Sequence, residues 1–571
     1  MKKLIPILSL PIFAISAFAQ SPMDAGYMSQ YDLRGTARFM GMAGAFGALG
    51  GDLSTLSQNP AGIGIYRSSE IGFTLDLDFN SSKSHAGNYI TKDNHTKFYL
   101  NNIGGVATLR LKSNAVPNLN LGFTYNKAAS FSRRYKGYMP DLNTSLSNYI
   151  AGINNAWDLT EVDVKATSNY DPYYDNMYGR QVPWISILGY DSYLVNPEGD
   201  PQNPNWKGQF GDGTSGNGIF EMEEKGSIDE YNIAIGGNIK NIVYWGMDFD
   251  IVSIDYSVNS IWGEGLTNAY VYNPNANVGR GGVERMNADW RLRNDYKING
   301  TGFNYKLGVI VKPIQELRLG FTFHTPTYYN LTQTCFDQSI SFKYPFLQDT
   351  SYTNGGTAST FSYDFRSPWR IIASAAGVIA NKFIVSADYE WRGYKNMKYS
   401  APNSYGVDYY DPDYGWDTPW DYPWGWDYGP SPRSRSEGSA YAESNGYIKE
   451  IYQNSNTLRL GAEWRVIPSF SLRVGYSFTS SPITAKARDN KMEIPSSGTM
   501  TSYRMDNTTN YITAGVGYRV KKFYADLAYV YKRMDSEYHP FTPDVYSTLP
   551  AMQAKLTFNT SQLVLSMGFR F

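Results

Sequence analysis

The residue types that could support catalysis are few and scattered along the chain. Besides one cysteine, Cys335, there are four histidines: His85, His95, His324 and His539. The sequence has no G-x-S-x-G motif beside these histidines and no H-E-x-x-H pair, and Gly41, Gly44 and Gly47 are spaced as GxxGxxG, unlike a dinucleotide-binding loop. One cysteine also excludes an intrachain disulfide framework and a multi-cysteine metal site. We therefore expect no enzyme activity, no cofactor and no metal.

Two arginines stand at the start of a glycine- and alanine-rich stretch that runs from Gly35 to Arg67. A guanidinium pairs well with a carboxylate, so Arg34 and Arg38 could receive an acidic ligand. They could equally form salt bridges to acids such as Asp76 and hold the stretch in place. We favour the salt bridges.

The same stretch carries a few apolar side chains, Phe39, Met40, Met42 and Phe46. They could line a pocket for an apolar ligand, or they could be the surface on which the stretch packs. The stretch has too many glycines for a membrane strand and too few large apolar residues for a core of its own. We therefore expect it to fold inside a wall made by the rest of the chain.

Residues 406–430 are dense in aspartate, tryptophan and tyrosine. Such a segment could stack on sugars or hydrophobic ligands, or bind calcium through its carboxylates. The aspartates lack EF-hand spacing, so we favour a variable external loop whose aromatic side chains pack on each other.

The N-terminus and the composition indicate export to a membrane. Residues 1–19 read as a signal peptide, with Lys2 and Lys3 before an apolar run and Ala17-Phe18-Ala19 at its end. The chain is 16% aromatic with a mean hydropathy of −0.42, and its net charge of −1 implies no nucleic-acid partner. A polar-looking, aromatic-rich chain can enter a membrane through strands that alternate apolar and polar residues in a closed barrel.

That alternation is present. Ile71, Phe73 and Phe79 are separated by polar or small residues that include Asp76 and Asp78, whose side should be a wet lumen. About fourteen such segments follow one another along the chain: 69–80, 97–112, 117–133, 226–240, 242–260, 292–312, 315–331, 366–380, 382–398, 448–466, 470–482, 508–520, 523–535 and 556–571.

Short turns and long loops alternate strictly between these segments. The long loops are 81–96, 134–225, 261–291, 332–365, 399–447, 483–507 and 536–555. Within 134–225 we expect a short helix from Leu142 to Ala156. Outer-membrane barrels have short periplasmic turns, long outer loops and an even strand number. We therefore predict an all-β fold, an antiparallel transmembrane barrel of about 14 strands, integral to the bacterial outer membrane and surrounded by its lipid.

Several motifs resemble a known family. Ala37-Arg38, Met40-Gly41-Met42, Gly44-Ala45-Phe46 and Asn59-Pro60-Ala61-Gly62 are similar to the N-terminal hatch signature of the FadL/TodX outer-membrane transporters of long-chain fatty acids and aromatic hydrocarbons. Ala43 stands where that family often has a further glycine. Leu317–Gly320 with Thr325-Pro326, Ser367-Pro368-Trp369, and Leu472–Tyr476 with Ser481-Pro482 resemble strand ends of the same family.

The resemblance implies a division into a signal peptide (1–19), a hatch inside the lumen (20–68) and a barrel (69–571) with large extracellular loops at 134–225 and 399–447. It further implies that a hydrophobic ligand is captured between the loops, moves to a site against the hatch and leaves through a gap near the third strand. Asn59, Pro60 and Ala61 would then lie beside residues 117–133.

The residues of that strand are compatible with such a gap. Gly122 and the small residues Ala128 and Ala129 would weaken lateral packing, because glycine inside a strand often marks a bulge. At the other end of the chain, Phe571 resembles the signal that the barrel-assembly machinery reads.

These observations favour passive uptake of a hydrophobic small molecule, a fatty acid or an aromatic hydrocarbon. The alternative is a surface receptor or adhesin for haem or a carbohydrate, in which the barrel is only an anchor. A general porin is a weaker interpretation, because an internal plug closes the aqueous lumen.

Overall fold

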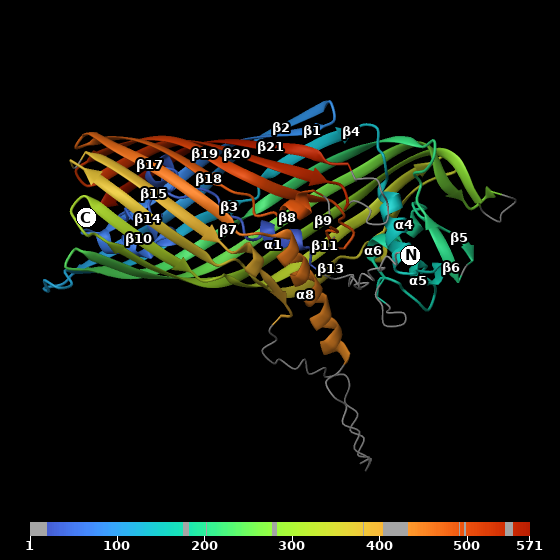
Figure 1. The fold of residues 1–571 in the computed structure, drawn as a ribbon, viewed down its shortest axis with the longest axis horizontal. Coiled ribbons are helices and arrows are strands. Elements are labelled where there is room, and N and C mark those ends of the chain that lie inside the picture. Colours follow the sequence, from blue (N-terminus) through green and yellow to red (C-terminus); the bar gives the residue numbers. More distant parts are fainter. Residues whose placement is uncertain are drawn as a thin grey trace, which may run out of the picture.

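Fourteen antiparallel strands close into a barrel in the computed structural model of the chain (Figure 1). The structure describes residues 20–174, 182–200, 202–276, 282–380, 382–402, 432–489, 492–495, 498–542 and 552–571. Each strand pairs with its predecessor in the following order, and the last strand pairs with the first. The wall consists of β1 (Glu70–Ala86), β2 (Tyr89–Arg110), β3 (Asn118–Ser130), β7 (Ser215–Ile239), β8 (Val243–Asn273), β9 (Gly282–Val311), β10 (Leu317–His324), β14 (Arg370–Ile379), β15 (Phe383–Arg392), β17 (Ser455–Ile467), β18 (Phe470–Thr479), β19 (Tyr503–Val520), β20 (Phe523–His539) and β21 (Ala554–Arg570).

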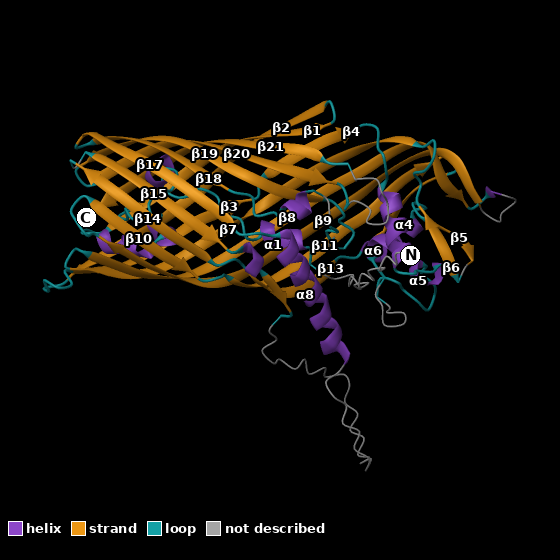
Figure 2. Ribbon diagram, in the orientation of Figure 1, coloured by secondary structure: helices purple, strands orange, loops and turns teal. Residues whose placement is uncertain are grey.

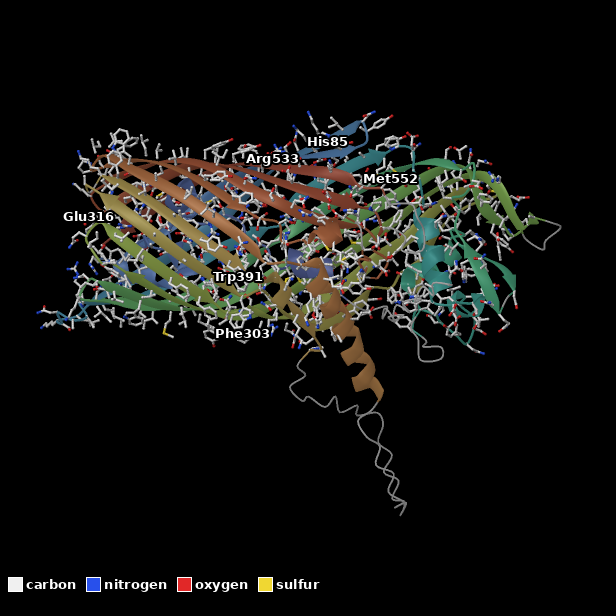
Figure 3. All side chains as sticks on the ribbon, viewed as in Figure 1. His85, Phe303, Glu316, Trp391, Arg533 and Met552 are labelled. Carbon is white, nitrogen blue, oxygen red and sulfur yellow. The ribbon has the colours of Figure 1, made fainter. Side chains whose placement is uncertain are left out.

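Side-chain alternation explains why these segments form a barrel in lipid. On β1, Ile71 and Phe79 are exposed on the outer surface, whereas Asp76 and Asp78 are buried on the lumen side. Figure 3 shows side chains over the outer surface of the wall, with Phe303 of β9 at its edge. Because closure leaves no unpaired strand edge facing lipid, the backbone polar groups of the wall are satisfied between strands. The predicted fold class and strand number are confirmed.

The two ends of the barrel differ in their connections. The short turns 240–242, 312–316, 468–469 and 521–522 lie at one end together with the C-terminus, and the long insertions lie at the other (Figures 1 and 2). Phe571 closes this end, since its backbone N–H donates to the Ser69 carbonyl at 3.0 Å and its ring stacks on Phe569. In outer-membrane barrels the short-turn end faces the periplasm.

Several predicted loops are in fact extensions of strands. Residues 81–96 form a continuous hairpin of β1 and β2, paired up to Ala86 and Tyr89, and β7, β8 and β9 continue well past the 9–11 residues that span a membrane. The additional strands are β4 (Arg133–Met139), β5 (Asn196–Asp200), β6 (Asn203–Lys207), β11 (Tyr328–Tyr344), β12 (Leu347–Tyr352), β13 (Ser359–Arg366) and β16 (Lys398–Ser400). Outside the membrane both faces of a strand are polar or packed, so period-2 alternation disappears although the strand continues.

Helices gather in the insertions at the long-loop end. The predicted helix within 142–156 is present as α4, and the strand expected to start at 448 begins only at Ser455, because α8 occupies the preceding residues. The insertions contain α4 (Leu146–Ala156), α5 (Glu161–Val164), α6 (Trp184–Asp191), η2 (Thr353–Gly356), η3 (Tyr394–Asn396), α8 (Pro432–Ile451) and α9 (Ala485–Arg488). None of the helices in the described part of the chain is both long and apolar enough to cross a membrane. The predicted signal peptide and the aromatic segment 406–430 lie outside the described residues.

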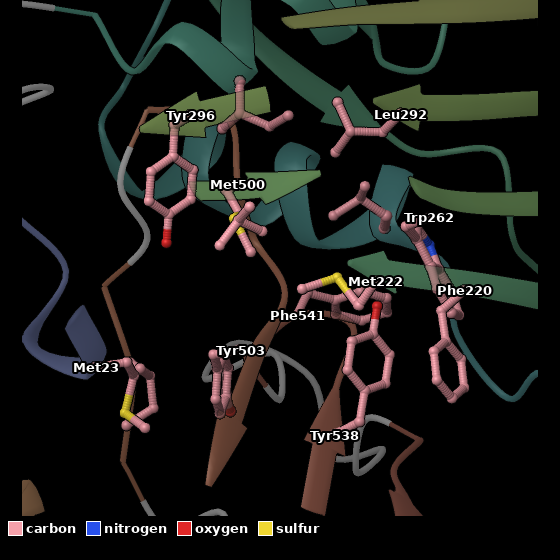
Figure 4. Close-up of a cluster of buried hydrophobic side chains, with 14 of the residues drawn as sticks. Met23, Phe220, Met222, Trp262, Leu292, Tyr296, Met500, Tyr503, Tyr538 and Phe541 are labelled. Atoms are coloured by element: carbon pink, nitrogen blue, oxygen red, sulfur yellow. The ribbon is translucent and has the colours of Figure 1, made fainter. Parts of the chain in front are cut away.

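A large apolar core lies under these insertions rather than in the barrel wall. It joins helix side chains such as Trp184 and Leu188 to inward-facing residues of the extended strands, including Trp262 and Trp290. Figure 4 shows one part of it, in which Met23 from the N-terminal segment lies near Tyr296, Met500 and Tyr503, with Trp262, Phe220, Tyr538 and Phe541 beyond. The long insertions and the N-terminal segment therefore share one core.

Candidate functional site: the plug and the wall beside it

Residues 20–68, called the plug from here on, lie within the ring of strands. Short helices make it up: α1 (Pro22–Tyr27), α2 (Ala37–Gly41), α3 (Thr55–Gln58) and the 3₁₀ helix η1 (Pro60–Ile65). Side-chain caps fix where the helices begin, since Thr36 Oγ1 accepts from the Phe39 N–H at 3.2 Å and Asn59 Oδ1 from the Ala61 N–H at 3.0 Å. On one side the plug contacts β18 to β21 through α2, and on the other β3 and β7 to β9 through η1. The plug thus spans the lumen.

The apolar residues singled out from the sequence form the packing surface of the plug. Phe39, Met40, Met42 and Phe46 are buried in a cluster with wall residues that include Ala528 and Val564. The Phe39 and Phe46 rings lie 5.5 Å apart. Cavities against the plug have mixed linings: one of about 60 Å³ is bordered by Phe39 together with arginines of the wall.

Both candidate arginines pair with acids of the wall, as favoured from the sequence. Arg34 Nη1 lies 3.0 Å from Asp76 Oδ2 and its Nη2 lies 2.6 Å from Asp78 Oδ2. Arg38 Nε lies 3.0 Å from Glu463 Oε2. Burial would lower the pKa of Arg34, but the carboxylates around it raise it above the usual range. These buried ion pairs fix the plug to β1 and β17.

A wall carboxylate also binds the backbone of the plug. Asp388 Oδ2 on β15 accepts from the N–H groups of Phe46 at 3.1 Å and Gly47 at 3.0 Å, and from Gln58 Nε2 at 3.1 Å. Such a contact satisfies donors that no secondary structure of the plug uses. The sequence places this aspartate within a predicted strand, 382–398, but does not identify it as a plug contact.

Glycines of the wall admit the plug backbone, a feature that sequence reasoning missed. A Cβ at Gly246 of β8 would lie 2.1 Å from the Pro60 carbonyl oxygen, and one at Gly320 of β10 would lie 2.4 Å from that of Gly47. A Cβ at Gly461 would lie 2.7 Å from the Met42 carbonyl oxygen, and one at Gly475 would lie 2.5 Å from the Met42 carbonyl carbon. In the sequence, each of these glycines stands two residues from other inward-facing side chains, which places it on the lumen face. Strand glycines have several other uses, so this position alone does not predict a contact with the plug.

The position of the Asn-Pro-Ala element differs from the prediction. Asn59, Pro60 and Ala61 lie against Gly246 of β8 and Gly308 of β9, not beside β3. Later residues of η1 make the contact with β3, where Asn120 Nδ2 donates to the Ile63 carbonyl at 2.6 Å. Because η1 is a helix, its successive residues face different strands, and sequence spacing alone does not show which strand each one meets.

Gly122 does not interrupt the third strand. It pairs with Val106 of β2 on one side and Ala234 of β7 on the other. A Cβ there would lie 2.6 Å from Leu56 Cδ2 and 2.9 Å from Ile63 Cδ1, so the glycine provides space for the plug.

An interruption does occur further along β3. Backbone pairing with β2 ends at Asn102 and Asn126, and the register with β7 shifts between Lys127 and Ala129, so that Ala128 is the bulged residue. Beyond this point β2 and β3 are joined by side chains, such as Tyr99 Oη to Ser130 Oγ at 2.8 Å. The predicted small residues Ala128 and Ala129 thus lie where the β2–β3 ladder is open.

The plug supplies part of the missing pairing. The Asp32 N–H donates to the Ala128 carbonyl at 2.8 Å, and the Ser130 N–H donates to Asp32 Oδ2 at 3.1 Å. Lys532 neutralises the same carboxylate. A cavity of about 40 Å³ lies behind the open ladder, bordered by Asp32, Ser130 and Phe558. This junction of plug and wall was not predicted from the sequence.

Asp24 of α1 is a buried acid in an aromatic setting at the other end of the plug. Its Oδ1 accepts from Tyr296 Oη at 2.9 Å, and its other oxygen has no hydrogen-bond partner among the described residues. Burial raises the pKa of Asp24 to about 7, and the Tyr296 hydrogen bond opposes this increase.

No protein-family model and no curated protein matches the chain. Solved structures show a likeness: a FadL homologue from Pseudomonas aeruginosa is 12% identical with a TM-score of 0.48, over 95% of this chain and 99% of that one. The toluene transporters TodX of Pseudomonas putida and TbuX of Ralstonia pickettii are each 12% identical over the same shares, with TM-scores of 0.42 and 0.44. The fold is assigned from the strand register described above.

Proposed function

We propose that this chain is an outer-membrane channel through which hydrophobic small molecules, fatty acids or aromatic hydrocarbons, pass inward without energy coupling and leave sideways into the membrane. The observation that carries this proposal is the opening of the β2–β3 ladder next to Asp32, where the plug replaces a neighbouring strand. Phe98 and Leu100 face outward at the same level of β2, so an apolar solute leaving there would enter lipid.

Energetics favour a sideways exit for such a solute. Each methylene buried from water contributes about 0.8 kcal/mol, so a long apolar chain gains far more by entering the bilayer than by entering water at the short-turn end. The plug fills the lumen that a water-filled porin would need open.

The test compares binding with transport. Native mass spectrometry of the mature protein, offered a long-chain fatty acid, toluene and haem together, should show selective retention of the fatty acid or toluene. Ala128→Phe, which adds bulk at the bulged residue of β3, should abolish uptake of the retained compound into proteoliposomes but leave its binding intact.

Ala387→Phe on β15 is the matched control, because that strand is paired on both sides at this position. Unchanged uptake by Ala128→Phe would refute sideways release. Retention of haem alone would instead favour a barrel-anchored receptor.

A further inference from the structure

A cavity of about 580 Å³ opens at the short-turn end of the barrel, below the plug. We call it the vestibule. Six cationic side chains line it: Arg38, Lys382, Arg465, Arg473, Arg519 and Arg570. The acids that line it are Asp52, Glu70, Glu463 and Asp526. The volume is typical of small-molecule sites, and the cations exceed the acids by two.

The acids of the vestibule already have partners. Glu463 accepts from three arginines, with Arg473 Nε at 2.8 Å, Arg38 Nε at 3.0 Å and Arg465 Nε at 3.3 Å. Asp526 lies 2.5 Å from Arg473 Nη1. Because three guanidinium groups share one carboxylate, some of their N–H donors have no carboxylate partner, and those of Arg465, whose side chain is 45% exposed, can reach solvent.

The other two acids are occupied as well. Glu70 accepts from Arg570 Nε at 2.6 Å and from Tyr524 Oη at 2.7 Å. Asp52 accepts from the Thr36 hydroxyl at 2.7 Å inside the plug. All four acids thus accept hydrogen bonds, and Asp52 alone among them has no cation within 4.0 Å in the described part of the chain.

Two cations are left over. Within the part of the chain that the structure describes, no carboxylate lies within 4.0 Å of the Arg519 guanidinium or the Lys382 ammonium. Both side chains are exposed, Arg519 at the end of β19 and Lys382 in the turn before β15. Both line the same cavity, so their charges add in a space walled by protein.

We propose that the vestibule binds an oxyanion, the carboxylate or phosphate group of a small molecule from the aqueous space at this end. Guanidinium groups present paired donors that fit carboxylate and phosphate oxygens. A cavity with low-dielectric walls and one excess sign of charge concentrates counter-ions. Arg519 and Lys382 would hold the anion, and Arg465, which is half exposed, would complete the site.

This proposal is independent of sideways release. A hydrophobic solute that leaves between β2 and β3 does not enter the vestibule, which is bordered by the strands from β14 to β21 and the start of β1. Either proposal can therefore fail while the other stands.

The test is calorimetric titration of the mature protein in neutral detergent at low salt, with inorganic phosphate, succinate and decanoate as probes and decanol as the uncharged comparison. We expect at least one anion to bind and decanol not to bind at this site. The double variant Arg519→Gln, Lys382→Gln should weaken that binding about tenfold. Phosphate as the tightest probe would indicate a phosphate ligand, and decanoate would indicate a carboxylate with an apolar tail.

Arg533→Gln is the control, an arginine at the opposite end of the barrel that pairs with Asp535 at 3.2 Å and is half exposed. Absence of binding for all three anions, or equal weakening by the double variant and by Arg533→Gln, would overturn the proposal.

A second measurement does not depend on guessing the ligand. Ser469 lines the vestibule and Cys335 is buried, so Ser469→Cys provides one accessible thiol. A sulfonate-bearing thiosulfonate reagent should modify it about fivefold faster than the ammonium-bearing analogue. The double variant should remove this preference, and equal rates in the parent would contradict an excess of positive charge.

Discussion

Replacing Gly246 by alanine should displace the plug without disturbing the barrel. The added methyl carbon would lie 2.1 Å from the Pro60 carbonyl oxygen, 2.3 Å from its carbon and 2.6 Å from the Ala61 nitrogen. All three are backbone atoms, so no side-chain rotation relieves the clash. An ordinary carbon–oxygen contact is about 3.3 Å, so Asn59–Gly62 would have to move by about 1.2 Å.

Such overpacking costs about 1–3 kcal/mol. Because alanine is tolerated in a strand, we expect the cost to fall on the plug and not on the pairing of β8 with β7 and β9. Local opening of residues 55–66 should then become roughly tenfold to a hundredfold more frequent. Amide hydrogen exchange read by mass spectrometry would show faster exchange in that peptide and unchanged protection of β8.

Gly377→Ala provides the comparison. Its added methyl carbon would meet only Val385 Cγ2, at 3.4 Å, which is ordinary contact. If Gly246→Ala and Gly377→Ala gave the same exchange in residues 55–66, the idea that wall glycines seat the plug would be refuted. Faster exchange throughout β8 would also refute it, since the clash would then have been absorbed by the wall.

Two further substitutions test the buried charges. Arg34→Gln should destabilise the fold by about 3–5 kcal/mol, because Asp76 and Asp78 stay buried without their cation. The control Arg533→Gln, which removes an exposed ion pair, should cost under about 1 kcal/mol. Equal thermal unfolding midpoints for the two variants would contradict this. For Asp24, the folded-state pKa of about 7 exceeds the unfolded value of 3.8, so the folded state keeps a proton that the unfolded state releases, and the free energy of unfolding falls as pH rises from about 4 to 7. Asp24→Asn should remove this loss of stability, which is about 4 kcal/mol at most. The unfolding midpoint of Asp24→Asn should therefore exceed that of the parent by an amount that grows from pH 5 to pH 8. A difference that stays constant with pH would disprove the role assigned to Asp24.

Lipid explains why the wall was predictable from the sequence. Within the bilayer every outward position must be apolar and every inward one can be polar, so Ile71 and Asp76 alternate visibly. Residues 81–96 extend the same two strands into water, where neither face is constrained, and the sequence there gave no strand signal. Residues 448–454 form too short a segment for the spacing of their apolar residues to distinguish the last turn of α8 from a strand.

The sequence predicted that the plug lies inside the wall, but it did not predict which wall residues the plug contacts. Glycine content indicated that residues 35–67 need a surrounding wall, and the salt bridges of Arg34 and Arg38 followed from charges that must be paired. Which wall residue each contact meets depends on strand stagger and on the direction in which each residue of the helix η1 faces. That is why Asn59 was placed beside β3, although it lies against Gly308 of β9.

The distribution of contacts limits how the plug can move. If it left as a whole, Asp76 and Asp78 would lose Arg34, at a cost of several kcal/mol for uncompensated buried charge, and Glu463 would keep only its two wall arginines, Arg465 and Arg473. At the open ladder the plug contributes two hydrogen bonds of Asp32 with β3, worth about 1–3 kcal/mol together, and the Asp32 carboxylate also pairs with Lys532 of β20. A shift that keeps the Asp32–Lys532 pair breaks only the two bonds to β3, so we expect it to be far cheaper than expulsion of the plug and to open the β2–β3 junction while the rest of the plug stays in place.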